Sequence, residues 1–238
     1  MTARLCGVGW KRFGLTADVA DKTEETGKDS VYTRLLDDIG KGVYPSGTRL
    51  KVQELAARYG TSIIHVREAL RLLQGQGIVE IALNKGASVS TLSADMILEI
   101  FEILQLLEPY LVGSFARSCT EEDIAEIAEI NARIEATPVS DKAAFSTLDK
   151  AFHEAIAARH YNRRAYQIWE LQRRILNALA LPLPISTARH RTILKEHAAM
   201  IEAFRQNDEA RAVEVINAHV QGAGDQMYHQ LRMHEARP

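Results

Sequence analysis

The apolar pattern of this 238-residue chain changes period between residues 78 and 90, and this change constrains the fold more than any other feature. Before it, apolar residues recur at the spacing of helices. Within it, two short strand-like pieces, 78–81 and 87–90, flank Asn84-Lys85-Gly86, which is typical of a hairpin turn. After residue 93 only helical spacing returns. We therefore expect a mainly α protein with one small hairpin and two units that meet near residues 90–93.

Three short helices are expected ahead of the hairpin. Ser30 can cap the first, Gly60 ends the second, and Thr61 or Ser62 can cap the third. The third carries an apolar stripe at helical spacing: Val66, Ala69, Leu70 and Leu73. Three helices and a hairpin within about 60 residues are typical of a winged helix-turn-helix.

The second unit is expected to be an antiparallel all-α helical bundle. Ser93, Thr120 and Ser140 are plausible N-caps, and prolines stand in the gaps between helical stretches. Helices are expected over 94–117, 120–135, 141–158, 163–180, 188–206 and 208–231. The chain then divides into a mobile arm over 1–27, a winged helix-turn-helix over 28–92 and a helical domain over 93–238.

Charge and composition limit the classes of function. Residues 28–90 hold nine Lys or Arg against six Asp or Glu, whereas residues 91–238 hold 16 against 21. A mildly basic unit joined to an acidic one fits nucleic-acid binding by the first unit only. No apolar run approaches the roughly 20 residues of a membrane helix, and no signal peptide is expected. Cys6 and Cys119 have no motif spacing, so we expect a cytoplasmic protein with reduced thiols and no membrane partner.

The third helix has what the reading of duplex DNA requires, an apolar face that anchors it and polar donors on its outer face. With the apolar stripe turned inward, Arg67 and Arg71 point outward. The N-terminus of the helix suits a phosphate, and Lys85 at the hairpin tip can reach a second phosphate or the minor groove. The alternative is that the two arginines are an ordinary solvated face. The residues expected at the DNA interface are Gln53, Thr61, Ser62, Ile64, His65, Arg67, Arg71, Lys85 and Gly86.

This stretch resembles the winged helix of the GntR family over most of residues 30–90. The resemblance is carried by Tyr44-Pro45-Ser46-Gly47, Val66-Arg67-Glu68-Ala69-Leu70-Arg71-Leu72-Leu73, Gly77-Ile78-Val79-Glu80 and Lys85-Gly86-Ala87-Ser88-Val89. Two positions depart from the family pattern, since Ile63 and Gln53 stand where the family has DNA-contacting arginines. Isoleucine can contact only a thymine methyl. The departures leave open whether DNA binding is weaker or only differs in specificity.

Four polar side chains stand on the apolar faces of three helices in the second unit. Asp149 and His153 are four residues apart and share a helix face, while His197 and His219 stand among apolar neighbours. Unpaired polar groups are costly inside a protein, and convergence on one divalent cation per subunit would satisfy all four. Zinc is the first choice, and nickel, manganese or iron also suit these ligands. The alternative is a hydrogen-bonded cluster in the core.

The second unit resembles the FCD effector domain of the FadR-type subgroup over about residues 94–230. The resemblance is carried by Leu107-Glu108-Pro109, Leu148 to Ile156 with Asn162, Glu196-His197 with Ala203, and Asp208 to His219. It implies that the four polar residues bind the metal and that a small carboxylate effector binds at its open positions. Leu104 replaces an arginine that often assists in this subgroup. Gln105, Arg164 and Gln172 are candidates to substitute for it, the alternative being that each is a partly exposed polar residue.

Together these features predict a DNA-binding transcriptional regulator, expected to act as a repressor, whose affinity for a double-stranded operator is controlled by a small organic acid. It should be a homodimer, because two DNA half-sites require two-fold symmetry. Two alternatives stay open, a helical-bundle metalloenzyme and a winged-helix module that only binds proteins. An enzyme needs a positioned general base, and no acidic residue is clearly placed for that. The remaining histidines, His160, His190, His229 and His234, are interpreted as surface residues.

Overall fold

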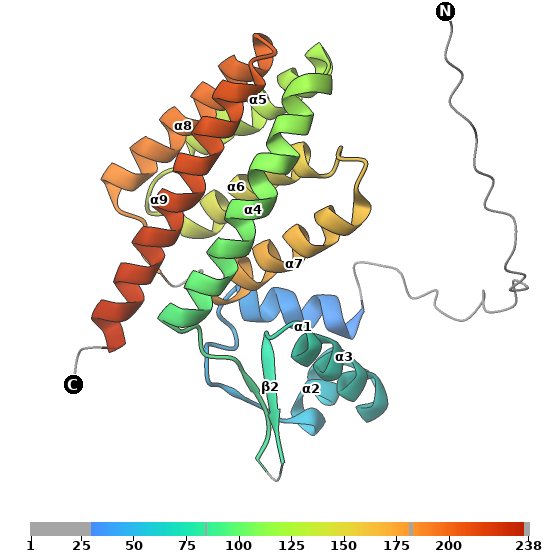
Figure 1. The fold of residues 1–238 in the computed structure, drawn as a ribbon. Helices are drawn as coiled ribbons and strands as arrows, with labels where there is room; N and C mark the ends of the chain where they lie inside the picture. Colours follow the sequence, from blue (N-terminus) through green and yellow to red (C-terminus); the bar gives the residue numbers. More distant parts are fainter. Residues whose placement is uncertain (1–29, 84, 181–182, 236–238) are drawn as a thin grey trace, which may run out of the picture.

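The computed structural model describes residues 30–83, 85–180 and 183–235. The arm expected over residues 1–27 and the turn residue Asn84 lie outside this range. Within it, a smaller unit of three helices and a three-stranded sheet packs against one end of a six-helix bundle (Figure 1). The predicted fold class is therefore confirmed. In the described part of the chain, no helix is long and apolar enough to cross a membrane.

The smaller unit consists of α1 (Val31–Gly40), β1 (Arg49–Leu50), α2 (Val52–Tyr59), α3 (Ile63–Gly75), β2 (Val79–Ala82) and β3 (Gly86–Val89). The hydroxyls of Ser30 and Ser62 cap α1 and α3 by accepting hydrogen bonds from backbone amides of the first turn. Gly60 ends α2 with a φ of 63°, a left-handed conformation that glycine adopts at little cost. Local capping chemistry thus sets the helix bounds that the sequence predicts.

The sheet contains one strand that sequence reasoning missed. Its order is β1-β3-β2, with both pairs antiparallel. Strand β1 has only Arg49 and Leu50, which pair with Ser88 and Ala87 of β3. Two residues are too few to show an alternating pattern, so β1 is defined only by its partner.

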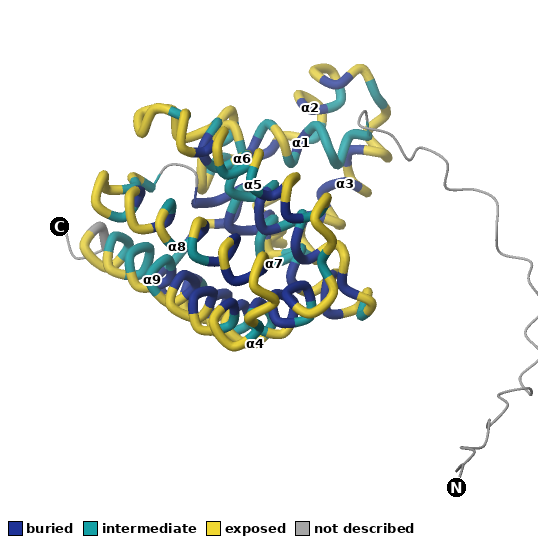
Figure 2. The backbone as a smooth tube through the Cα atoms, turned by 90° about the horizontal axis from the view of Figure 1, so that it is seen from above, coloured by how far each residue is buried: buried dark blue, intermediate teal, exposed yellow. Residues whose placement is uncertain are grey.

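The bundle consists of α4 (Ala94–Ser118), α5 (Glu121–Ala136), α6 (Lys142–Ala157), α7 (Arg163–Leu179), α8 (Thr187–Arg205) and α9 (Glu209–Glu235). Helices α4 and α9 lie side by side, and the surfaces of the helices that face one another are buried (Figures 1 and 2). Gly224 permits a close approach, because a Cβ there would lie 2.9 Å from Cγ of Phe101. Helix α9 also packs on α8, α8 packs on α5, and α6 packs on both α4 and α5.

Two of the histidines expected at the surface are buried. Only 4% of His160 and 6% of His190 are exposed. The His160 ring packs on Tyr110 with ring centroids 4.4 Å apart, and the His190 ring packs on Phe145 at 5.1 Å. Both partners come from other helices, which is why the polar local sequence misled the prediction. His229 is exposed, and the side chain of His234 lies outside the described part.

The two units are joined by a short hydrogen-bonded chain between α7 and α1. Arg174 of α7 donates a hydrogen bond of 2.6 Å to the hydroxyl of Tyr32. That hydroxyl donates in turn to Oε1 of Gln76, 2.8 Å away, directly after α3. Tyr32 therefore links the bundle to the end of α3.

Candidate functional site

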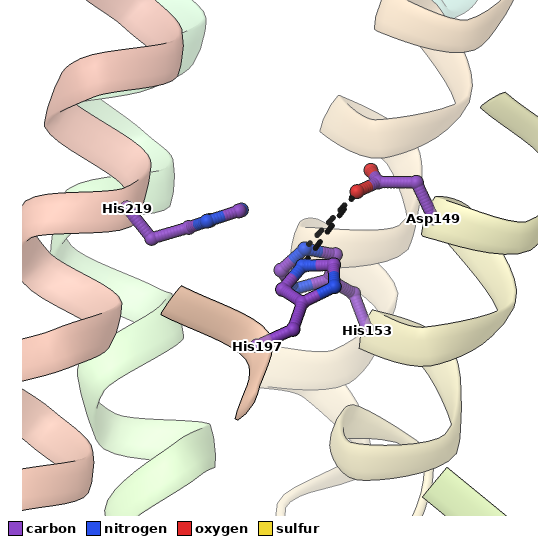
Figure 3. Close-up of side chains that lie close together, drawn as sticks. All are labelled: Asp149, His153, His197 and His219. Atoms are coloured by element: carbon purple, nitrogen blue, oxygen red, sulfur yellow. Dashed lines mark ion pairs between the residues drawn. The ribbon is translucent and has the colours of Figure 1, made fainter. Parts of the chain in front are cut away.

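Four side chains from three helices converge inside the bundle. Asp149 and His153 come from α6, His197 from α8 and His219 from α9, and one ligand atom of each lies within 4.8 Å of the others. Figure 3 shows the three imidazoles and the carboxylate directed toward one another. The three histidines are 0–3% exposed, and the side chain of Asp149 is 21% exposed. The structure thus brings together the four residues that the sequence nominated as metal ligands.

The outer nitrogen of each ring faces an oxygen acceptor. Nδ1 of His219 lies 2.8 Å from Oε2 of Glu196, and Nδ1 of His197 lies 3.2 Å from Oδ1 of Asn131. Nδ1 of His153 faces Oε2 of Glu108 at the longer distance of 3.9 Å. An imidazole that donates from Nδ1 keeps the lone pair of Nε2 for a metal.

Two of the inner nitrogens lack hydrogen-bond partners in the described part of the chain. Nε2 of His153 and of His197 are buried and, among the described residues, form no hydrogen bond. They lie 3.9 and 3.7 Å from Oδ1 of Asp149, too far for hydrogen bonds. Two ligands held tetrahedrally by zinc at about 2.0–2.1 Å lie about 3.3 Å apart, close to this spacing. Orphaned buried nitrogens around a carboxylate therefore fit a cation better than a hydrogen-bonded core cluster.

The electrostatics favour the form of histidine that binds metals. Burial holds the pKa of His153 and His197 well below the ordinary 6.5, and nearby positive charge adds to this effect. Burial also raises the pKa of Asp149, and the Arg173 guanidinium partly offsets that rise. Burial alone would raise the pKa of Glu196, but the hydrogen bond with His219 and the charge of Arg189 lower it overall. The rings of His153 and His197 are thereby kept neutral near Glu196, whose lowered pKa keeps its carboxylate ionised.

Two acidic residues flank the cluster, although sequence reasoning placed none there. Glu108 is 2% exposed and accepts hydrogen bonds from Nε1 of Trp169 at 3.0 Å and Nε of Arg173 at 2.8 Å. Glu196 accepts from Arg189 at 3.1 Å as well as bonding His219. The Glu196 carboxylate therefore orients the His219 ring by a hydrogen bond, whereas Glu108 is held through Oε1 by Trp169 and Arg173 and faces His153 at 3.9 Å without bonding it.

A cavity of about 100 Å³ opens beside the cluster, and its lining includes both Asp149 and His219. Arg173 of α7 and Arg189 of α8 also line it, with side chains 13% and 11% exposed. Guanidinium groups have a geometry that suits carboxylates, and in this structure Arg173 is paired with Glu108 and Arg189 with Glu196. Gly222 makes room for one of them, since a Cβ there would lie 2.8 Å from a guanidinium nitrogen of Arg189.

The three residues expected to assist the effector do not line this cavity. Gln105 and Arg164 are exposed, and Gln172 is half-buried. On α7 the cavity is lined by Arg173, the residue next to the predicted Gln172. Successive side chains on a helix point about 100° apart. The long mixed sequence of α7 did not define which of its residues face inward.

The outer face of α3 is open to solvent. Val66, Ala69, Leu70 and Leu73 are buried, whereas Arg67 and Arg71 are exposed. Ser62 caps the helix, and Oγ1 of Thr61 lies 3.2 Å from Nδ1 of His65. The other residues expected to contact DNA are also exposed: Gln53, Ile64, His65, Lys85 and Gly86. Ile64 is 66% exposed and Ile63 is 40% exposed, so both apolar side chains are presented at the start of this helix.

Comparisons with known proteins assign both units. The model of bacterial regulatory proteins of the gntR family matches residues 28–89, and the FCD domain model matches residues 99–222. The transcriptional repressor GlaR of Escherichia coli K12 is 28% identical over 202 residues, covering 79% of this chain and 90% of that protein. The gluconate operon repressor of Bacillus subtilis 168 is 26% identical over 198 residues, covering 79% and 80%.

The fold has known counterparts as well. The solved structure of Escherichia coli McbR/YncC superposes with a TM-score of 0.70 at 22% identity and covers 84% of this chain and 96% of that one. The named relatives are regulators and not enzymes, in agreement with the sequence-based prediction. The chain therefore belongs to the GntR family of bacterial regulatory proteins and is a DNA-binding transcriptional regulator with an FCD domain.

Proposed function

We propose that this regulator is a repressor whose affinity for operator DNA is controlled by a small carboxylate bound at a divalent cation in the FCD domain. The observation that carries the proposal is the pair of buried, unpartnered Nε2 atoms beside Asp149, next to a cavity lined by two arginines. The two relatives named as repressors support the regulatory role.

Each residue of the site has a defined task in this proposal. Asp149, His153, His197 and His219 would hold the cation, which when bound supplies open coordination positions for an anionic oxygen. Zinc is the first choice, and nickel, manganese or iron would also suit three imidazoles and a carboxylate. Arg173 and Arg189 supply charge-assisted hydrogen bonds for the acid.

A duplex-selection experiment tests the function. Metal-loaded protein is used to enrich random duplexes, and affinity for the enriched sequence is then measured against salt and a panel of small carboxylates. We expect salt-dependent binding to one sequence and a change of about 5- to 150-fold with one of the acids, lost after chelation. Failure to enrich any sequence would favour a protein-binding module. Specific binding that ignores both metal and acids would refute the sensing role.

Arg67→Ala is expected to cost about 1–3 kcal/mol of operator binding and to relax base preference, because Arg67 is on the exposed face of α3. Lys85→Ala should weaken all duplexes alike and lower the salt slope by about one, as a phosphate contact does. Fluorescence anisotropy measures both. Arg133→Ala, an exposed arginine of the bundle, is the control. Unchanged operator affinity in Arg67→Ala would show that α3 is not the recognition helix.

We infer that an apolar face on α4 and α7 joins two copies of the chain. Leu98, Leu106 and Ile168 are 50%, 78% and 49% exposed on these neighbouring helices. Exposed apolar patches mark association surfaces, and DNA half-sites call for two-fold symmetry. Leu106→Glu is expected to convert a micromolar dimer into a monomer in sedimentation velocity, whereas Val139→Glu should not. A wild-type monomer at that concentration would refute the dimer.

Metal occupancy is expected to persist as the pH falls through 6.5. A neutral imidazole binds metal, and a pKa held below the ordinary value keeps His153 and His197 neutral at lower pH than free histidine. Protonation of His153 or His197 should therefore displace the metal only at a pH well below 6.5. Dialysis at stepped pH followed by elemental analysis measures this. Half-loss at pH 6.5 or above would contradict it.

A further inference from the structure

The cavity beside the cluster is longer than a two- or three-carbon acid requires. Its lining residues recur on successive turns of three helices, over 142–149 on α6, 173–180 on α7 and 219–230 on α9. At 1.5 Å per residue these stretches are about 10, 10 and 16 Å long. Asp149, Arg173 and His219 each lie at one end of their stretch and are close to one another in space, so the cluster closes one end of an elongated space.

The walls beyond the cluster are largely apolar. Phe101, Phe145, Leu176, Ile193 and Met227 line the cavity from five different helices. Four of them are at most 6% exposed, and Met227 is half-buried. Such walls favour methylene or aromatic groups over hydroxyl groups, although Ser146, Gln226 and Lys142 also line the cavity and can form hydrogen bonds.

Polar atoms return farther along the cavity. Nδ2 of Asn177 and Oε1 of Gln230 are buried and, within the described residues, have no hydrogen-bond partner. The amide nitrogen of Gln230 is engaged, donating to the carbonyl of Pro184 at 2.6 Å. An unpartnered donor on α7 and an unpartnered acceptor on α9 suit a ligand with a hydrogen-bonding group away from its carboxylate.

We propose that the effector is an elongated carboxylic acid, with an apolar chain or ring between its carboxylate and a distal hydrogen-bonding group. In this proposal, short acids and acids hydroxylated along their whole length bind more weakly than the cognate class. The inference rests on the proposed function, which places the carboxylate at the cation and the two arginines. It adds the structure of the rest of the acid, which is selected by the part of the cavity beyond the cluster.

A homologous series tests the class. Calorimetry on metal-loaded full-length protein compares acetate, butanoate, hexanoate and octanoate with gluconate and 6-hydroxyhexanoate. The dissociation constant is expected to fall by about fourfold per methylene until the cavity is filled. Gluconate should bind no better than acetate, and 6-hydroxyhexanoate at least as tightly as hexanoate. Acetate or gluconate binding as tightly as hexanoate would overturn this inference and leave the proposed function standing. No binding by any acid would overturn both.

A cavity-filling variant provides an independent measurement. Ala180 lies two turns beyond Arg173 on the cavity wall and is 8% exposed. Ala180→Leu is expected to shift the preferred chain to a shorter acid while leaving acetate binding unchanged. Ala128→Leu, at a half-buried alanine of α5 outside the lining, is the matched control. An unchanged chain-length optimum in a folded Ala180→Leu protein would overturn the inference, and if that variant does not fold the wild-type series still decides.

Discussion

Replacement of His197 by alanine is expected to abolish stoichiometric metal binding and the thermal stabilisation that the metal provides. His197 is fully buried, and its inner nitrogen lies 3.7 Å from Asp149. A cation at 100 times its Kd stabilises the folded state by about 2.7 kcal/mol. At roughly 2–4 °C per kcal/mol for a chain of this size, chelation should lower the wild-type Tm by about 5–10 °C. Elemental analysis and melting curves with and without chelator measure both effects.

The comparison must separate metal loss from lost packing, because the His197 ring also stacks on Phe152 with centroids 3.9 Å apart. The Tm of the variant is therefore compared with the Tm of chelated wild-type protein. Because neither protein holds metal, the difference between the two values measures the lost packing alone. His229→Ala, at an exposed histidine of α9, should keep the full metal content. The His197→Ala variant should retain a folded winged helix and some DNA binding. If native-host protein carries no metal, and zinc, nickel and manganese leave the melting curve unmoved, the four residues are only a core cluster.

Arg173→Met is expected to lower the free energy of unfolding by about 3–5 kcal/mol, because it leaves the carboxylate of Glu108 buried without its charged partner. Among the described residues, Glu108 would then keep the hydrogen bond from Trp169 alone. The same variant should bind carboxylates weakly, since it removes one of the two guanidinium groups in the cavity. Urea unfolding measures the first effect and calorimetry the second.

Arg164→Met on the same helix is the matched control, because Arg164 is exposed and does not line the cavity. It should change neither stability nor acid affinity by a measurable amount. Arg173→Met with wild-type stability would show that Glu108 does not depend on this ion pair. If Arg173→Met binds acids with wild-type affinity, the carboxylate binds elsewhere.

Features set by local chemistry could be predicted from the sequence. The caps at Ser30 and Ser62, the turn at Gly60 and the buried stripe of α3 all depend on residues within a few positions of one another. The four converging ligands could also be nominated, because each is a polar residue on an otherwise apolar helix face. Their meeting in space required helices α6, α8 and α9 to pack, which the resemblance to the FCD domain supplied.

Features set by distant partners could not be predicted in this way. Strand β1 exists only through its pairing with β3. His160 and His190 are buried by rings from other helices, and Glu108 is drawn into the core by Trp169 and Arg173. Whether Arg173 faces the cavity depends on how α7 is rotated about its own axis when it packs. None of these contacts leaves a periodic signal in the sequence.

The hydroxyl of Tyr32 lies between the acid site and the DNA-binding unit that the proposed function couples. It accepts from Arg174, the neighbour of a cavity residue, and donates to Gln76 at the end of α3. Thermodynamic linkage requires that the factor by which an acid changes operator affinity equals the factor by which the operator changes acid affinity. DNA-bound and DNA-free copies of the regulator then differ in acid affinity, so they are half-saturated at different acid concentrations. In the proposed function, the operator is thereby itself an effector of the FCD domain.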